Sequence, residues 1–203
     1  MNQLSSTQQE IIGEFVDLAI TKSLSSMQGM LNIRLRKDYA RFGIGIIRPI
    51  PEFESMGRFK VHIIKVNLNG ELGGALYFVI NAYEVGIINK ACLPEDVTST
   101  LNHANKEMKN GFILEIENII AASSVTEIAD LLGVELLGAV PEVEILKGNE
   151  VNEYLRNESS KFHSSFHMEA VLKGIDLNIS PYVIWMLDKR FVKKLKENVV
   201  EPD

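Results

Sequence analysis

The sequence predicts an α+β fold in which two long helices pack on one antiparallel sheet built from both halves of the chain. Three observations predict it: two long segments with helical spacing of apolar residues, two pairs of β-rich runs joined by tight turns, and the same order of elements in each half. A chain of 203 residues can bury a substantial core. We therefore expect a single domain over residues 1–203 with pseudo-repeats at about 5–93 and 96–198.

The first long helix is expected over residues 5–31, and residues 32–48 then become β-like. Runs 59–68 and 72–80 are rich in β-branched and aromatic residues and flank Asn69-Gly70, a strong signal for a tight hairpin turn. A short helix over residues 83–93 completes the first half. The helical spacing of the first segment rests on Ile11, Ile12, Phe15, Leu18, Ala19, Leu24, Met27 and Leu31.

The second half repeats this order. A long helix is expected to begin near residue 96, with Asp96 or Thr98 as N-cap, and to end at Gly133 after about Leu132. Lys173-Gly174 marks another hairpin turn. The remaining elements are expected as short strands 134–137 and 143–146, a short helix 149–156, hairpin strands 162–172 and 175–187, and a basic amphipathic helix 188–198.

An internal comparison of the two halves supports a duplication. The identities are few, and the matching order of elements is the stronger argument for a pseudo-twofold arrangement. An offset of about 101 residues aligns Glu14, Asp17, Ser23, Leu31 and Leu35 with Glu115, Asn118, Ser124, Leu132 and Leu136. An offset of about 104 aligns Gly70, Val79 and Ile80 with Gly174, Val183 and Ile184.

Composition excludes several classes of protein. Apolar residues make up 46% and charged residues 24%, which is close to an ordinary soluble domain, and no apolar run approaches the roughly 20 residues of a membrane helix. The net charge is −6 and the basic residues are dispersed, so we expect neither a nucleic-acid nor a membrane partner. The start of the chain does not resemble a secretory signal, and Cys92 is the only cysteine. We expect a cytoplasmic protein.

One strip of the second long helix combines polar and small side chains. Gly111, Glu115, Asn118 and Ala122 are spaced three or four residues apart and share one face. The small residues would let the backbone of a partner approach closely. Spacing alone also fits ordinary solvated residues, but the pair recurs in altered form as Glu14 and Asp17 in the other half.

These residues resemble those of the chemotaxis phosphatases CheC, CheX and FliY, whose signature is a Glu-x-x-Asn pair on one or both of two pseudo-symmetric long helices. The resemblance covers nearly the whole chain. It includes the segments Leu114-Glu-Ile-Glu-Asn-Ile119, Ala129-Asp-Leu-Leu-Gly133 and Asn69-Gly-Glu-Leu-Gly-Gly-Ala-Leu76. It implies a CheC-like fold and allows a homodimer joined at a sheet edge.

The resemblance also implies a function: a phosphatase that hydrolyses the aspartyl phosphate of CheY-like response-regulator receiver domains, in bacterial chemotaxis or two-component signalling. Asn118 would position the attacking water, and Glu115 would pair with a lysine of the regulator. Gly111 and Ala122 would lie against the partner. The Mg²⁺ would belong to the regulator, so we expect this chain to need no cofactor or metal of its own.

The first helix departs from the signature. Asp17 stands where the signature has Asn, and a carboxylate offers only acceptors and repels a phosphoryl group. We therefore interpret Glu14 and Asp17 as a degenerate second site. Gly111 also replaces the Asp or Ser that the family often carries four residues before the Glu. The alternative is a non-catalytic CheC-like protein that binds or scaffolds a signalling partner.

A second polar cluster has the spacing of a possible metal site. His163, His167 and Glu169 share one face of an expected strand, as metal ligands would. Ser164 and Ser165 lie between them, and no further acidic or cysteine ligands match. We interpret the cluster as exposed strand positions.

Overall fold

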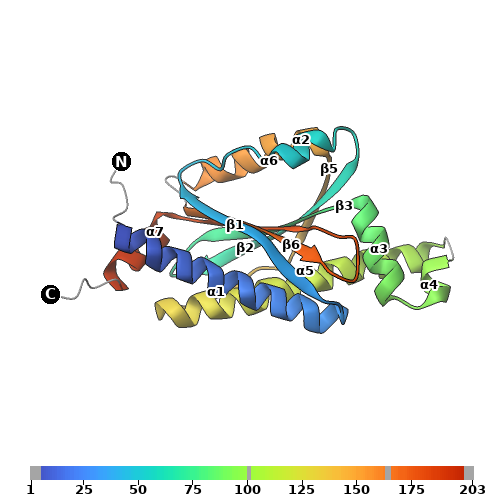
Figure 1. Cartoon of the computed structure of the whole chain (residues 1–203), viewed down its shortest axis with the longest axis horizontal. Helices are drawn as coiled ribbons and strands as arrows, with labels where there is room; N and C mark the ends of the chain where they lie inside the picture. The colour runs from blue at the N-terminus through green and yellow to red at the C-terminus, as the bar shows by residue number, and fades with distance from the viewer. Residues whose placement is uncertain (1–5, 100–101, 163–165, 199–203) are drawn as a thin grey trace.

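The structure is a computed structural model that describes residues 6–99, 102–162 and 166–198. Within them, a seven-stranded antiparallel sheet lies between two helical layers (Figure 1). The helices are α1 (Ser6–Leu31), α2 (Pro51–Ser55), α3 (Ala82–Cys92), α4 (Glu95–Ser99), α5 (His103–Leu132), α6 (Gly148–Lys161) and α7 (Lys189–Asn198). The strands are β1 (Leu35–Ile44), β2 (Lys60–Gly70), β3 (Gly74–Asn81), β4 (Leu136–Gly138), β5 (Glu142–Lys147), β6 (Phe166–Gly174) and β7 (Tyr182–Leu187). The predicted fold class is confirmed.

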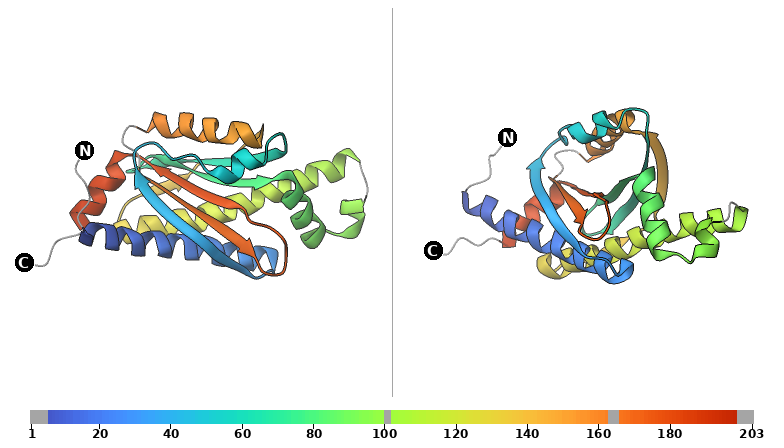
Figure 2. Two further views of the ribbon diagram at one scale, coloured as in Figure 1. Left: turned by 45° about the horizontal axis from the view of Figure 1, so that its top comes forward. Right: turned by 45° about the vertical axis from the view of Figure 1, so that its right-hand side comes forward.

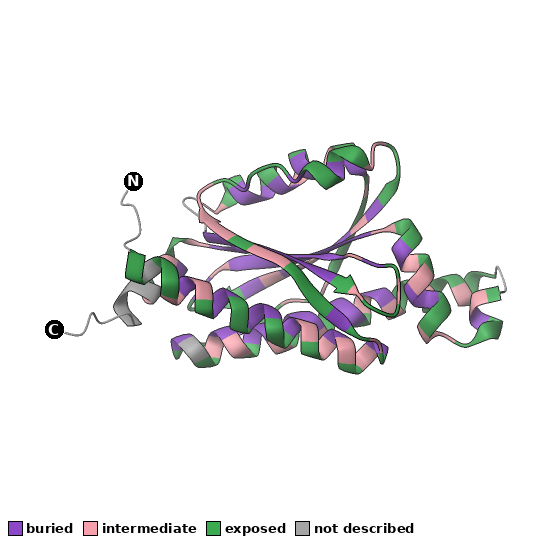
Figure 3. Cartoon of the chain, in the orientation of Figure 1, coloured by how far each residue is buried: buried purple, intermediate pink, exposed green. Residues whose placement is uncertain are grey.

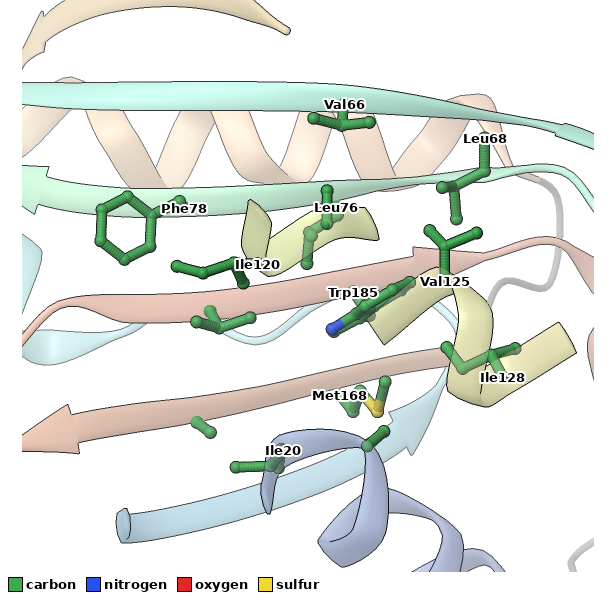
Figure 4. Packing of buried hydrophobic residues seen from close by; sticks show 14 of the residues in the cluster. Ile20, Val66, Leu68, Leu76, Phe78, Ile120, Val125, Ile128, Met168 and Trp185 are labelled. Atoms are coloured by element: carbon green, nitrogen blue, oxygen red, sulfur yellow. The ribbon is translucent and has the colours of Figure 1, made fainter. Parts of the chain in front are cut away.

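The sheet separates two hydrophobic cores. Helices α1 and α5 lie side by side on one face, and α2 and α6 cover the other (Figures 1 and 2). Figure 3 shows the buried residues of α1 and α5 on the side turned toward the sheet, with exposed residues on the outside. The larger core includes the buried residues labelled in Figure 4: Ile20, Val66, Leu68, Leu76, Phe78, Ile120, Val125, Ile128, Met168 and Trp185.

The strand order is β1-β6-β7-β3-β2-β4, and β5 also pairs with β2. Strand β1 therefore adds to the hairpin of the second half, while β4 and β5 add to the hairpin of the first half. The central pairs are Phe78 with Val183 and Val79 with Tyr182. An exchange of the halves at the offset of about 104 converts one of these pairs into the other. The pseudo-twofold axis passes between them.

The same symmetry relates the two long helices. The hydroxyls of Ser23 in α1 and Ser124 in α5 are hydrogen-bonded to each other, and these two residues match at the offset of about 101. Each hydroxyl also lies close to the carbonyl one turn earlier, that of Ala19 (3.0 Å) or Ile120 (2.7 Å). Helices α1 and α5 thus meet at equivalent residues, as a duplicated arrangement requires.

The start of α5 differs from the prediction. Asn102 is its N-cap, and the Asn102 side chain accepts a hydrogen bond of 2.7 Å from the Asn105 backbone N–H. The start signal at Pro94 instead opens the separate helix α4, so the prediction of Asp96 or Thr98 as the cap was wrong. The predicted end was correct: Gly133 lies directly after α5 with a left-handed φ of 60°.

The second hairpin is also shorter than predicted. Residues 175–181 form a loop rather than a strand. In this loop, Asp176 accepts hydrogen bonds from Arg34, the residue before β1 (Nη2 to Oδ1, 2.6 Å). Pro181 offers no backbone N–H for strand pairing, and β7 begins just after it. Helix α2 was not predicted, and α6 extends to Lys161 rather than residue 156.

Candidate functional site

The strip on α5 lies on the outside of the molecule. Gly111, Glu115, Asn118 and Ala122 are all exposed, while the inward positions of the same helix are filled by buried Ile113, Ile116 and Ile120. The structure thus brings the four predicted residues together along one accessible line. Their functional roles stay predictions.

Glu115 and Asn118 lie in the middle of α5, whose ends are fixed by the Asn102 cap and by Gly133. Neither side chain makes a hydrogen bond or ion pair with any residue in the described ranges. A free carboxylate therefore stands one turn from a free carboxamide, which has both a donor and an acceptor. The rigid helix can present both groups to a docking partner.

Glu117, between these two positions, points the other way. Its side chain is 0% exposed, and neither carboxyl oxygen has a hydrogen-bond partner among the described residues. Burial raises the pKa of the Glu117 carboxyl well above its usual range. The matching residue of α1 is Val16, which is also buried. A carboxyl group thus occupies a position that the other half fills with an apolar side chain.

The strip on α1 is different in charge and contacts. Glu14 and Asp17 are exposed, as expected for a strip that faces water. The Asp17 carboxylate forms an ion pair with Lys37 of β1. Sequence reasoning missed Lys37 because it lies outside the helix and approaches Asp17 only when β1 folds beside α1.

The prediction that the polar cluster on β6 is exposed is wrong for His167 and Glu169. His167 and Glu169 are buried, with 8% and 1% exposure, because β6 lies between β1 and β7 and its face is covered. Glu169 pairs with Arg41 of β1. Burial raises the pKa of the Glu169 carboxyl, although Arg41 opposes this, and burial lowers the pKa of His167. His163 lies outside the described residues, and within them no cluster of three or more His, Cys, Asp or Glu residues is arranged for a metal.

Known proteins are similar to this chain along much of its length. No model of a known protein family matches the sequence. The chain is 22% identical over 144 residues to the CheY-P phosphatase CheC of Bacillus subtilis (strain 168), which covers 71% of this chain and 69% of CheC. Within the described residues, no helix has the length and hydrophobicity needed to cross a membrane.

Solved structures share the fold. FliY from Thermotoga maritima superposes with a TM-score of 0.63 at 19% identity and covers 97% of each chain. A chain of the CheX-CheY complex with BeF3 and Mg²⁺ from Borrelia burgdorferi gives 0.54 at 17% identity, over 86% of this chain and 98% of that one. A chain of the FliM-SpeE complex from H. pylori gives 0.60 at 8% identity, over 98% and 100%.

These likenesses define the class of protein: the chain has the fold of chemotaxis proteins in which two pseudo-symmetric helices pack on one sheet. Its fold is the CheC-like fold that these structures share.

Proposed function

We propose that this protein is a phosphatase of phosphorylated, CheY-like receiver domains and that it hydrolyses their aspartyl phosphate in bacterial chemotaxis or two-component signalling. The observation that carries the proposal is the exposed pair Glu115 and Asn118 on α5, whose side chains have no partner within residues 6–99, 102–162 and 166–198. Two comparisons support it. The similar protein CheC is a CheY-P phosphatase, and a similar structure is a complex of CheX with CheY.

Asn118 is the catalytic residue in this proposal. An aspartyl phosphate is an acyl phosphate and already labile, so the main requirement is a water held in line with the bond that breaks. The carboxamide oxygen of Asn118 accepts a hydrogen bond from that water, and the amide N–H group can donate beside the anionic phosphoryl group. Water then attacks phosphorus, the bond to the aspartyl oxygen breaks, and inorganic phosphate leaves.

Glu115 is the docking residue. One turn away from Asn118, its carboxylate can pair with a cationic side chain of the receiver domain and so fix the register of the complex. Gly111 and Ala122 on the same strip carry little or no side chain, which lets the receiver approach the helix closely. The Mg²⁺ is part of the phosphorylated receiver in this proposal, and this chain supplies no ligand to it.

The test is a dephosphorylation assay with the CheY-like receiver domains of the source organism. Asn118→Ala should slow the accelerated reaction by at least about 100-fold, since misplacement of a reacting group has effects of that size. Asn110→Ala is the matched control, because Asn110 is an exposed asparagine of the same helix. It should leave the rate unchanged. An Asn118→Ala variant as fast as wild type would contradict the proposal.

The second candidate is a CheC-like protein that binds a signalling partner without catalysis. Asp17, Gly111 and the likeness to a chain of the FliM-SpeE complex favour it. Saturable binding of a phosphorylated receiver by wild type, with no acceleration of phosphate loss, would select this candidate.

A further inference from the structure

An ion pair between Lys37 and Asp17 distinguishes α1 from α5. Lys37 extends from β1 to the Asp17 carboxylate on α1, and their side chains are 37% and 55% exposed. On α5, Asn118 occupies the position that matches Asp17 and has no side-chain partner among the described residues. Of the two acidic residues of the first strip, Glu14 and Asp17, Asp17 is therefore already bound by a cation of its own chain.

Strand pairing identifies the residue of the second half that matches Lys37. Lys37 of β1 lies opposite Leu172 of β6, and Gly138 of β4 lies opposite Leu68 of β2. Leu68 and Leu172 match at the offset of about 104, and Lys37 and Gly138 match at the offset of about 101. The second half thus has glycine, with no side chain, where the first half has the lysine. The two halves therefore differ at two matched positions. The first half has Asp17 on α1 with Lys37 on β1, and the second half has Asn118 on α5 with Gly138 on β4.

We propose that Lys37 closes the α1 strip to receiver domains, so that each chain engages one receiver, on α5. This inference rests on the proposed function, in which a cationic side chain of the receiver pairs with a helix carboxylate. On α1 the carboxylate that matches Glu115 is Glu14, and Lys37, bound to Asp17 one helical turn away, presents a positive charge to an incoming cation. Like charges that face each other across an interface suppress the wrong complex.

The pair can be replaced without disturbing the core. Both side chains are partly exposed, and exposed ion pairs contribute little to folding stability. Asp17→Asn with Lys37→Gly converts the first strip to the pattern of the second. If Lys37→Gly unfolds the edge strand β1, Asp17→Asn with Lys37→Ser is a second variant, which keeps a side chain at position 37.

The experiment starts from Asn118→Ala, which removes the α5 reaction. Addition of Asp17→Asn and Lys37→Gly should raise the rate of phosphate loss from an acetyl-phosphate-treated CheY-like receiver by at least about 10-fold over Asn118→Ala alone. Asp17→Asn alone in that background should give no gain, because Lys37 remains. Titration with the beryllofluoride-treated receiver should show one bound per wild-type chain and two per chain of Asp17→Asn/Lys37→Gly.

Three results would overturn the inference: a folded triple variant no faster than Asn118→Ala, a full gain from Asp17→Asn alone, or two receivers bound per wild-type chain. The proposed function fails separately, if wild type accelerates phosphate loss from no receiver. In that case, the number of receivers bound by wild type and by Asp17→Asn/Lys37→Gly still decides the role of Lys37.

Discussion

At matching positions on two helices, Asn118 and Asp17 differ by a single chemical group. An amide can both donate and accept beside a phosphoryl oxygen, whereas a carboxylate at the same place only accepts and adds negative charge. Glu115 and Glu14, by contrast, are chemically identical. Their surroundings differ instead, because Lys37 lies near the α1 strip and Gly138 takes its place in the second half. The roles of the amide and the carboxylate can therefore be tested separately.

Reversal of charge at Glu115 tests the docking role. Glu115→Lys places like charge against a cation of the receiver and should weaken binding of the phosphorylated receiver by about 10-fold or more. Glu14→Lys is the matched control on α1 and should leave the affinity unchanged. Fluorescence anisotropy or calorimetric titration measures both. Equal affinities for wild type and Glu115→Lys would exclude Glu115 from the interface.

The buried carboxyl of Glu117 makes stability depend on pH. Its folded-state pKa is raised above the value of about 4.3 expected in the unfolded chain. The folded state therefore holds the proton more tightly, and this contribution is fully present below about pH 4 and is lost as pH rises through the raised pKa. At neutral and alkaline pH, the buried Glu117 carboxyl should therefore lower the free energy of unfolding.

Glu117→Val, which copies Val16, should raise the free energy of unfolding by about 1–3 kcal/mol at pH 8, because it removes an unsatisfied buried polar group. The gain should shrink toward pH 4. Urea unfolding at several pH values measures it, with the exposed change Glu115→Gln as control. A variant that is less stable than wild type at pH 8 would argue that Glu117 has a partner in the folded protein.

At the scale of elements, the start of α5 gives a direct comparison of two caps. Asn102→Ala removes the acceptor for the Asn105 N–H and should lower the free energy of unfolding by about 1 kcal/mol. Asp96→Ala changes a residue of the separate helix α4 and should alter stability by less than about 0.5 kcal/mol. Chemical denaturation of both variants checks this. The reverse order would place the start of the long helix at Asp96.

Elements fixed by local signals could be predicted from sequence, and those fixed by distant contacts could not. The antiparallel pairing of β2 with β3 follows from two adjacent β-rich runs. The predicted turn at Asn69-Gly70 was wrong, because both residues lie in β2 and pair with β4, and the turn lies at residues 71–73. The loop 175–181 contains Asp176, which contacts Arg34, a residue far away in the chain, and no local pattern indicates this contact. His167 and Glu169 were expected to be exposed because no local signal shows that β6 becomes an internal strand.

The same distinction applies to the site. Helical periodicity alone placed Gly111, Glu115, Asn118 and Ala122 on one face, and all four are exposed. Lys37 could not be found this way, since its approach to Asp17 requires β1 to pair with β6 of the other half. Only the folded sheet shows that the two strips have different neighbours.

At the scale of the whole molecule, the halves exchange strands. Each half needs a strand of the other to complete its part of the sheet, because β1 pairs with β6, and β4 and β5 pair with β2. We expect residues 1–94 and 95–203, produced separately, to be largely unfolded, while the full chain unfolds in one transition. Circular dichroism and thermal melts measure this. Cooperative melting of either isolated fragment would contradict the interdependence of the halves.

In the proposed function, the amide of Asn118 performs the chemistry. Its most direct test is the rate constant of phosphate loss from a phosphorylated CheY-like receiver in the presence of wild type and of Asn118→Asp, which recreates on α5 the side chain that α1 carries at Asp17. We expect wild type to accelerate phosphate loss and Asn118→Asp to return it to the intrinsic rate of the receiver. An Asn118→Asp variant that accelerates the reaction as well as wild type would contradict it.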